Sequence, residues 1–402
     1  MTTSLPIAPV PVLNAPAEGP AYLVANSIGY SNALARLSQG EGPFAVDAER
    51  ASGFRYDNRN YLVQVRRNGS GTFLFDPTSL PALDELNSLM QDDLWIFHAA
   101  TQDLGPLADQ GLVPPAIFDT EYGARMLGIE RVNLAAVTSH FLGVSLAKEH
   151  SHQDWSTRPL PESWLNYAAL DVELLVDLAH AERTELVAQG KFEWALQEFE
   201  HLRTLPPTPR QDPWRRTSGI QTIRDRKKLA VVRELWNERE KIAHAKDISP
   251  HRILPDRAII AAATTLPHTV GGLLSMHDFG GTANRRRAHL WQRAISKALA
   301  LPASELPPLR LPSTPKAPPV KLWAEKSPQA AEKYEPAKDL VDKLAEQLGM
   351  PVEHIVQPKV LRQLVWDAAI KPIDAPTYLV QNGARQWQID LVGPEVNVIV
   401  NN

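Results

Sequence analysis

Carboxylates in the first half of the chain have the types and spacing that could hold metal ions. Asp47 and Glu49 end the apolar run that begins at Phe44, and residues two apart on a strand point to the same face. Two adjacent carboxylates repel each other unless a cation lies between them, and Mg²⁺ and Mn²⁺ prefer oxygen ligands. The pair therefore predicts a metal site, with a solvated strand end as the alternative.

Three further residues have positions that could serve the same site. Asp103 follows the apolar run Trp95–His98, at the carboxyl end of a predicted strand, where open α/β sheets place their sites. Its alternative role is to cap the helix that follows. Tyr167 and Asp171 are four residues apart on a predicted helix, so that both project from one face, although a half-buried Tyr beside an exposed Asp fits this spacing too.

The elements that must position these residues follow from the apolar pattern. Short β-rich runs separated by turn residues predict a meander, and later strands alternate with helical patterns, which predicts parallel strands with helical crossovers. The predicted strands are 44–47, 61–65, 72–75, 94–97 and 117–118, and the predicted helices are 80–90, 121–127 and 165–186, the last as one continuous helix. The expected fold is a mixed sheet covered by helices, on which four acids converge.

Three motifs in this order resemble the DEDD 3′→5′ exonucleases. They are Asp47-x-Glu49, Asp103 at the end of His98-Ala-Ala-Thr-Gln-Asp, and Tyr167-x-x-x-Asp171, where the Tyr indicates the DEDDy branch. More narrowly, Lys148 and the segment Ser-His-Gln-Asp-Trp-Ser-Thr-Arg-Pro-Leu at 151–160 are similar to ribonuclease D. The resemblance covers residues 20 to 190 approximately, and it implies an α/β ribonuclease H-like exonuclease domain.

The resemblance also implies how the site works. Two divalent cations, Mg²⁺ or Mn²⁺, about 3.5 to 4 Å apart, stabilise phosphoryl charge and activate a water. We expect Asp47 to bridge both ions, Glu49 and Asp171 to complete one site, and Asp103 to support the second partly through water. Tyr167 is expected to orient the attacking water and to help remove its proton.

Contacts to nucleic acid outside the metal site are expected at a few basic residues. Lys148 and Arg158 match basic positions of the family and are assigned to phosphate, whereas Trp155 is assigned to packing. His98 is assigned to the scissile phosphate or the terminal ribose, with a satisfied core histidine as the alternative.

The function that the resemblance implies is 3′→5′ exoribonuclease activity on structured RNA such as tRNA precursors, releasing nucleoside 5′-monophosphates. A DNA-directed exonuclease of the same fold is one alternative, because carboxylates at a metal site do not sense a 2′-hydroxyl. An inactive RNA-binding scaffold is the other. No obligate protein partner is indicated, and the sequence does not tell which RNAs, which metal or which oligomeric state apply.

Charge is divided unevenly along the 402 residues. Residues 1–190 hold 11 Lys and Arg against 23 Asp and Glu, whereas residues 218–300 hold 15 against 7, which indicates metal chemistry beside polyanion binding. The basic segment has helical spacing and resembles the HRDC domain. If Thr282 or Asn284 caps its last helix, the first turn contains Arg285, Arg286 and Arg287. Positive charge there opposes the helix dipole, and a bound anion would relieve this. A phosphate contact is therefore favoured over a merely solvated face.

Proline-rich stretches suggest the domain boundaries. The expected parts are a disordered arm at 1–20, the exonuclease domain at 21–200, a linker at 201–217, the HRDC domain at 218–301, a Pro-rich linker at 302–322 and a second helical HRDC-like domain at 323–402, in which 387–392 has a strand-like pattern. The chain has no Cys, which excludes disulfides and thiolate metal sites. With no apolar run long enough for a membrane span, the protein is expected to be soluble and cytoplasmic.

Overall fold

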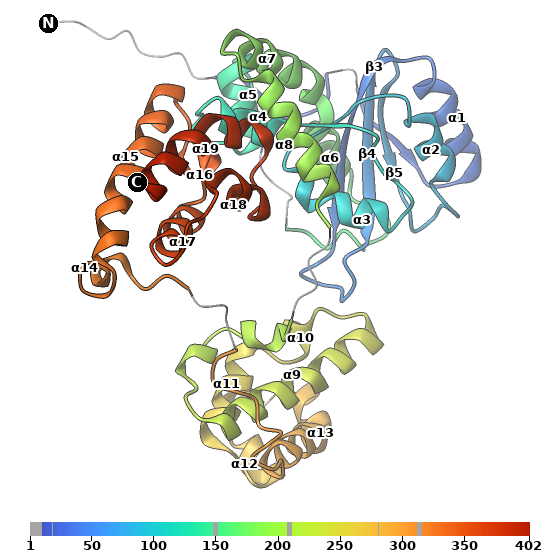
Figure 1. Ribbon diagram of the computed structural model, residues 1–402. Coiled ribbons are helices and arrows are strands. Elements are labelled where there is room, and N and C mark those ends of the chain that lie inside the picture. Colours follow the sequence, from blue (N-terminus) through green and yellow to red (C-terminus); the bar gives the residue numbers. More distant parts are fainter. Residues whose placement is uncertain (1–9, 18, 148–151, 207–210, 280, 312–315) are drawn as a thin grey trace, which may run out of the picture. The chain divides into compact units, whose positions relative to one another are not determined.

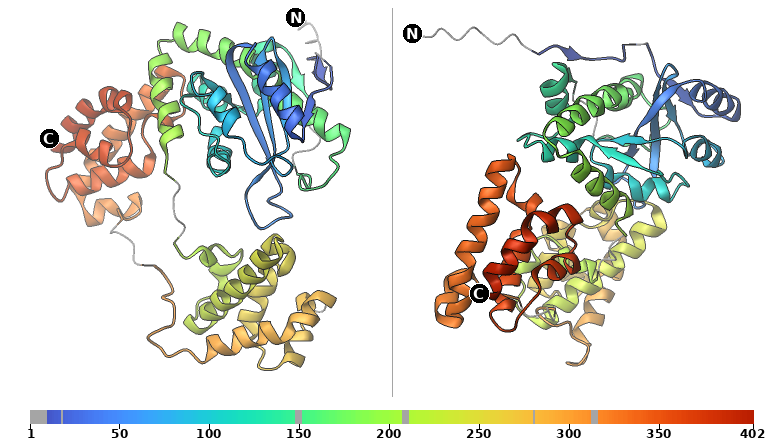
Figure 2. Two further views of the ribbon diagram at one scale, coloured as in Figure 1. Left: turned by 90° about the vertical axis from the view of Figure 1, so that its right-hand side faces the viewer. Right: turned by 45° about the horizontal axis from the view of Figure 1, so that its top comes forward.

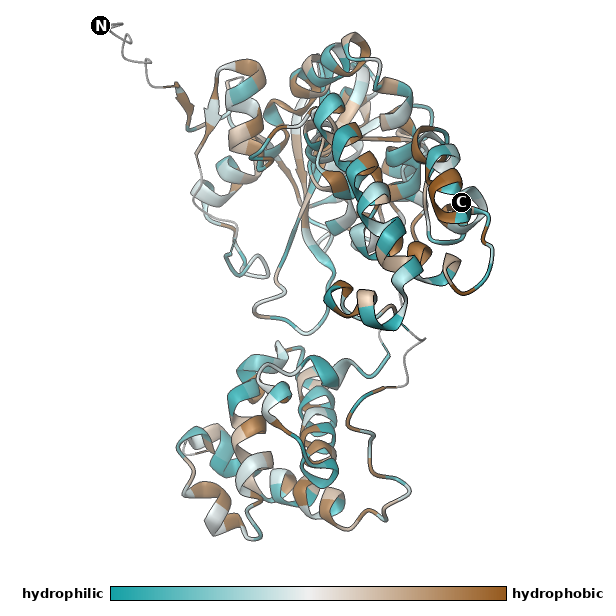
Figure 3. Ribbon diagram, turned by 60° about the vertical axis from the view of Figure 1, so that its left-hand side comes forward, coloured by the Kyte–Doolittle hydropathy of each residue, from teal (hydrophilic) through white to brown (hydrophobic). Residues whose placement is uncertain are grey.

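The computed structural model describes residues 10–17, 19–147, 152–206, 211–279, 281–311 and 316–402 (Figure 1). The chain forms two compact units. The first combines residues up to 49 with 59–206 and the segment from 316 to the C-terminus, and the second combines 50–58 with 211–311. Each unit contains its own buried apolar residues, and along the helices of both units apolar and polar residues alternate (Figure 3).

A six-stranded mixed sheet forms the centre of the first unit. Its strands lie in the order β2-β5-β4-β3-β6-β7. Their bounds are Tyr22–Val24 for β2, Glu41–Arg50 for β3, Asn60–Asn68 for β4, Gly71–Phe75 for β5, Trp95–Phe97 for β6 and Ile117–Asp119 for β7. β4 and β5 are antiparallel, whereas β3, β6 and β7 run parallel to one another. The predicted order, a meander followed by parallel strands, is confirmed.

Helices cover both faces of this sheet (Figures 1 and 2). On one face, Tyr30 of α1 packs edge-on against Phe75 of β5 and accepts a hydrogen bond from the backbone of α2. On the other, α6 packs against β4 and β5, and α4, α7 and α8 pack against β6 and β7. The bounds are Ser27–Leu37 for α1, Asp84–Leu89 for α2, Leu104–Ala108 for α3, Thr120–Met126 for α4, Leu134–Leu142 for α5, Glu162–Glu173 for α6, Leu175–Ala188 for α7 and Phe192–Thr204 for α8.

Two details of this unit differ from the sequence prediction. The single helix expected at 165–186 is broken at Leu174, so that α6 ends shortly after the residues expected at the site. The expected disordered arm is partly ordered, because strand β1 (Val12–Leu13) pairs in parallel with β8 (Ser145–Leu146). Backbone hydrogen bonds to a strand far away in the sequence order this segment, and local composition does not reveal such pairing. Residues 1–9 and 18 lie outside the described part.

The C-terminal segment of the first unit is helical. It contains α14 (Trp323–Lys326), α15 (Pro328–Leu348), α16 (Val352–Ile355), α17 (Pro358–Ala368), α18 (Ala375–Gln381) and α19 (Gln386–Asn401) around a shared apolar core. The strand-like pattern at 387–392 was misleading, since these residues lie within α19. Their alternation arises because Trp387 packs into the core of the sheet-containing part and Ile389 and Val392 into the helical core, while Leu391 packs against both.

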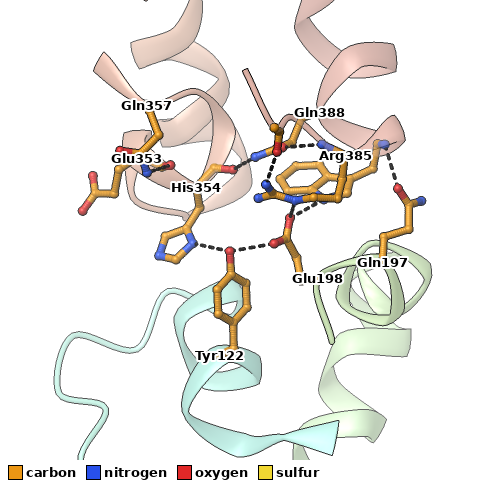
Figure 4. Close-up of polar contacts among 10 residues, drawn as sticks. Tyr122, Gln197, Glu198, Glu353, His354, Gln357, Arg385 and Gln388 are labelled. Atoms are coloured by element: carbon orange, nitrogen blue, oxygen red, sulfur yellow. Dashed lines mark hydrogen bonds and ion pairs between the residues drawn. The ribbon is translucent and has the colours of Figure 1, made fainter. Parts of the chain in front are cut away.

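A buried polar network joins this segment to the sheet-containing part of the same unit (Figure 4). Glu198 of α8 is buried, and its carboxylate accepts hydrogen bonds from Arg385 Nε at 2.7 Å, Trp387 Nε1 at 2.8 Å and Tyr122 Oη at 2.8 Å. The Trp387 ring stacks on Trp194 with centroids 4.9 Å apart. The network neutralises a buried charge and thereby fixes α19 against α8.

Replacing Glu198 with alanine is expected to destabilise the protein by about 3 to 5 kcal/mol, because the largely buried Arg385 is left without its counter-charge. The control is Glu200→Ala on the same helix, whose side chain is 56% exposed and pairs with Arg203. That pair is expected to contribute under about 1 kcal/mol. Denaturant unfolding of both variants checks the difference, and equal losses would contradict a docking role for Glu198.

The second unit is a small helical bundle. It contains α9 (Arg226–Lys246), α10 (Pro250–Ile253), α11 (Asp256–Thr265), α12 (Val270–Leu274) and α13 (Thr282–Leu299). Segments from outside the bundle also belong to this unit. The loop between β3 and β4 donates the backbone N–H of Tyr56 to Asp247 at 3.1 Å, and the carbonyl of Phe54 accepts from the backbone of Ser249 at 2.9 Å.

The two expected linkers are partly packed as well. Trp214 is buried in the core of the bundle, and so is Leu306. Arg226 donates to the carbonyls of Ala303 and Leu306, at 3.1 and 2.6 Å. The first stretch is not free of helix, since α8 continues to Thr204 and a short 3₁₀ helix begins at Pro213. The expected boundaries at 218 and 302 remain a prediction.

Candidate active site

Three carboxylates, two from β3 and one from α6, lie close together. One ligand oxygen from each of Asp47, Glu49 and Asp171 can be chosen so that all lie within 4.8 Å of one another. Burial and the neighbouring Asp47 charge both raise the pKa of Asp171, while a hydrogen bond from Tyr167 lowers it. Carboxylates this close repel one another, and a bound cation would offset the repulsion, so that the cluster could hold a divalent cation.

Tyr167 lies beside all three of these carboxylates. Burial raises the pKa of its hydroxyl, and the charges of Asp171, Glu49 and Asp47 raise that pKa further. The hydroxyl also shares a hydrogen bond with Asp171. Next to these charges the phenol stays protonated at neutral pH, so that it is suited to orienting a water molecule by hydrogen bonding rather than to accepting a proton.

Asp103 lies at the start of α3, buried and only 4% exposed. The capping alternative fails, because its side chain forms no capping hydrogen bond with α3. Among the described residues, the group of three oxygens within 4.8 Å does not include Asp103. Asp103 is therefore a buried carboxylate outside this group of three, and its expected role at a second metal stays a prediction.

A residue that the sequence did not single out positions Asp103. Asp119 at the end of β7 caps α4 by accepting from the backbone of Glu121 and Tyr122, at 2.9 and 3.2 Å. It also accepts from the backbone N–H groups of Ala99 and Ala100, at 3.1 and 2.9 Å. Ala99 has a φ of 68°, a left-handed conformation that costs a non-glycine residue about 1 kcal/mol. Asp119 offsets this strain and fixes the turn that leads to Asp103.

His98, expected to contact RNA, is satisfied within the protein. Its Nδ1 lies 2.9 Å from Oγ1 of Thr120, the first residue of α4. Burial lowers the pKa of the imidazole to about 4, so that His98 is neutral at physiological pH. These contacts favour the core-histidine alternative over an ionic contact to phosphate.

Replacing His98 with glutamine should change how stability depends on pH. Because the pKa of His98 in the folded chain, about 4, lies below its usual 6.5, the neutral side chain contributes stability above pH 6.5 that is lost as the pH falls toward 4. The full difference is about 3 kcal/mol. Burial raises the pKa of Asp119 to about 6, which acts in the opposite direction over an overlapping range. The difference between wild type and variant therefore isolates His98.

Chemical denaturation between pH 4 and pH 8 provides the measurement. The exposed His289→Gln variant in α13 is the control and should show a constant difference from wild type. A constant difference for His98→Gln as well would contradict the buried neutral imidazole.

The residues before α6 have mixed outcomes. Lys148 lies outside the described residues. Trp155 is fully buried, as expected for packing. Arg158 forms hydrogen bonds to Asp76 and to backbone carbonyls of the protein itself, so that the expected phosphate contact does not match its placement.

The arginines of the second unit lie at the surface, but their place in the helix differs from expectation. Arg285 and Arg286 are exposed, and Arg287 is half-buried. The last helix begins at Thr282, its N-cap is Gly281, and it has no side-chain cap. Arg285 is therefore the fourth helical residue, and the other two follow it. The unfavourable interaction of positive charge with the helix dipole is confined to the first turn. It therefore gives no reason to expect a phosphate at these arginines rather than an ordinary solvated basic face.

Comparison with known proteins places this site in a family context. Residues 23–186 match a family described as 3'-5' exonuclease, residues 228–295 match the HRDC domain, and residues 316–398 match a family described as 3' to 5' exonuclease C-terminal domain. Ribonuclease D of Gluconacetobacter diazotrophicus is 30% identical over 276 residues, which cover 66% of this chain and 69% of that protein. The chain belongs to the ribonuclease D family.

Solved structures agree with this family fold. A protein from Bifidobacterium adolescentis is 37% identical with a TM-score of 0.90, over 98% of this chain and all of that one. Escherichia coli RNase D has the same fold, with a TM-score of 0.67 at 22% identity over 94% of this chain and 98% of that one. The matches to the first curated ribonuclease D relatives span between 55% and 69% of their own length. Within the described ranges, no helix has the length and hydropathy needed to cross a membrane.

Proposed function

We propose that this ribonuclease D family member is a metal-dependent 3′→5′ exoribonuclease that trims structured RNA such as tRNA precursors. The observation that carries the proposal is the convergence of Asp47, Glu49 and Asp171, with ligand oxygens within 4.8 Å of one another. RNA as the substrate is supported by the names of the relatives, since Escherichia coli RNase D is described as an exoribonuclease involved in structured RNA processing.

The cluster of three carboxylates fits a divalent cation, and we propose two such cations, Mg²⁺ or Mn²⁺, at this site. Asp47, Glu49 and Asp171 would hold one, and Asp47 with the buried Asp103 would hold the other. When bound, such cations stabilise the charge on the phosphoryl oxygens and lower the pKa of an attacking water. The raised pKa of Asp171 supports this fit, because a nearby cation would offset the repulsion that raises it.

The residues of the chain perform the remaining tasks. The protonated Tyr167 hydroxyl donates to Asp171 and can orient the attacking water with its lone pairs. Asp119 holds the turn before Asp103, so that this carboxylate does not have to be ordered during the reaction. Hydrolysis releases a nucleoside 5′-monophosphate and leaves a new 3′-hydroxyl on the shortened chain.

Substrate and direction are tested with one set of oligonucleotides. Single-stranded RNA, DNA of the same sequence, and RNA with a 3′-phosphate are labelled at the 5′ end and incubated with Mg²⁺ or Mn²⁺. The proposal predicts a ladder that shortens from the 3′ end, faster on RNA than on DNA and blocked by the 3′-phosphate. Equal or faster cleavage of DNA would favour the DNA-directed alternative, and tight RNA binding without any ladder would favour the inactive scaffold.

We further propose that the surface arginines of α13 contact RNA phosphates. Replacing Arg285, Arg286 and Arg287 with glutamate should weaken RNA affinity and flatten its dependence on salt, because fewer counterions are released on binding. The control is the same charge reversal at Lys321, Lys326 and Lys333 in the C-terminal segment. If the arginine variant keeps the wild-type RNA affinity and salt dependence, these arginines do not contact phosphate and are ordinary solvated residues.

A further inference from the structure

Arg158 has every guanidinium N–H group engaged by the protein. Nε and Nη2 form a bidentate pair with Asp76, at 2.7 Å to Oδ2 and 2.8 Å to Oδ1. Nη1 donates to the carbonyls of Trp155 and Thr157, at 2.8 and 2.7 Å, and Nη2 also donates to the carbonyl of Tyr61 at 2.8 Å. A guanidinium has five N–H donors, and all five are used. None remains for a phosphate.

The partner of Arg158 is itself fixed to the sheet. Asp76 directly follows β5, and its side chain is only 4% exposed. It also accepts from the backbone N–H and the hydroxyl of Thr78, at 2.9 and 2.6 Å, and from the Ser79 hydroxyl at 3.1 Å. Burial alone would raise the pKa of Asp76, but the hydrogen bonds from Arg158 and Thr78 outweigh it and lower that pKa. The carboxylate is thus held ionised at the end of this strand.

The other end of this arrangement reaches Tyr167. Trp155, whose carbonyl Arg158 binds, is fully buried. Its ring lies 5.4 Å from the ring of Trp164 and 6.4 Å from the ring of Tyr167, measured between centroids, and both of these residues belong to α6. A continuous series of contacts therefore runs from Asp76 through Arg158 and Trp155 to Tyr167.

We propose that the Asp76–Arg158 pair is a positioning device for the reaction, which holds Trp155 against α6 and so fixes Tyr167 over the carboxylate cluster. The inference rests on the proposed exonuclease function. It assigns Arg158 to the geometry of the site and not to binding of the RNA. Misplacing a reacting group by about 1 Å can cost about 10²-fold in rate, which sets the size of the expected effect.

The conservative variant Arg158→Lys separates this role from a phosphate contact. Lysine keeps the positive charge but cannot reproduce the planar, bidentate fork. The positioning role predicts that Arg158→Lys and Asp76→Asn each lower kcat by about 10- to 100-fold, with KM and the salt dependence of RNA affinity within about threefold of wild type. If Arg158 instead contacted phosphate, Arg158→Lys would retain most activity, because lysine keeps the charge. Asp76→Asn would then have no effect on kcat.

The route through Tyr167 is tested by a double-mutant cycle. In the Tyr167→Phe background, the hydroxyl to be positioned is absent, and Arg158→Lys should cost less than about threefold in kcat. Independent effects, in which the two losses multiply, would overturn the proposal. Thermal unfolding of each variant gives a second readout, in which Asp76→Asn and Arg158→Lys should be non-additive because they break one pair.

A similar pair in the same unit provides the matched control. Arg67 donates to Asp93 Oδ2 at 2.7 Å and to the carbonyls of Gly42 and Leu37, at 3.0 and 3.2 Å. Gly42 lies at the opposite end of β3 from Glu49, roughly 20 Å away at the rise of a strand. Asp93→Asn should lower stability but leave kcat within about twofold of wild type. An equal fall in kcat for Asp93→Asn would mean that any loss of stability slows the enzyme, and would overturn the specific role of Arg158. A wild-type protein without hydrolysis would instead refute the proposed function.

Discussion

Replacing Asp47 with asparagine is expected to lower kcat/KM by at least about 10³-fold, or about 4 kcal/mol of transition-state stabilisation. Asp47 supplies a ligand oxygen to the cluster with Glu49 and Asp171, and it is the only one of the three proposed to serve both cations. The amide keeps the size of the side chain but removes the charge. The loss should therefore appear as weaker Mg²⁺ and Mn²⁺ binding in calorimetry as well as in the hydrolysis rate.

The same replacement should make the metal-free protein more stable. The charge of Asp47 raises the pKa of Asp171, because two neighbouring carboxylates repel each other when no cation is present. The neutral amide of the Asp47→Asn variant removes this repulsion, so that the melting temperature in EDTA should rise while activity is lost. The control is Asp109→Asn at the exposed C-terminus of α3, which should change neither property. A variant that keeps more than about a tenth of the wild-type rate would contradict the role given to Asp47.

Replacing Tyr167 with phenylalanine is expected to lower kcat by about 10²-fold or more, with little change in KM. The change removes one hydroxyl and keeps the ring that packs near Trp155. Loss of the hydrogen bond that lowers the pKa of Asp171 should raise that pKa further in the metal-free protein, so that cation binding weakens at a higher pH than in wild type. Cation binding at alkaline pH should stay close to wild type.

Tyr122→Phe is the matched control for this prediction. Tyr122 also donates its hydroxyl to a buried carboxylate, that of Glu198, at 2.8 Å, but it belongs to the network that docks the C-terminal helices. Its replacement should lower stability and leave kcat within about threefold, since no reacting group is touched. If Tyr167→Phe has no more effect on kcat than Tyr122→Phe, the orienting role of Tyr167 is wrong.

The sequence predicted the part of the site that depends on strand and helix periodicity. Asp47 and Glu49 share a face because side chains alternate along β3, and Tyr167 and Asp171 share a face because they are one turn apart on α6. The two pairs come together because α6, which carries Tyr167 and Asp171, packs against the sheet that contains β3. These regularities are local, and a single sequence contains them.

Contacts between distant segments were not predictable in the same way. Arg158 and Asp76 are 82 residues apart, and nothing in the local sequence of either residue distinguishes a buried fork from a phosphate ligand. Asp119 has the sequence signal of a helix cap, which it fulfils, but its bonds to Ala99 and Ala100 connect two crossovers. The helix break at Leu174 was not predictable either, because no Gly or Pro, the usual helix breakers, lies at this position.

The most direct test of the central claim follows hydrolysis of a 5′-labelled single-stranded RNA by wild type and by Asp103→Ala, in Mg²⁺, in Mn²⁺ and in EDTA. The account predicts a ladder shortening from the 3′ end with wild type and metal, none in EDTA, recovery when metal is added back, and a severe loss with Asp103→Ala. A ladder of undiminished rate in EDTA, or from Asp103→Ala, would contradict hydrolysis at a carboxylate-held metal site.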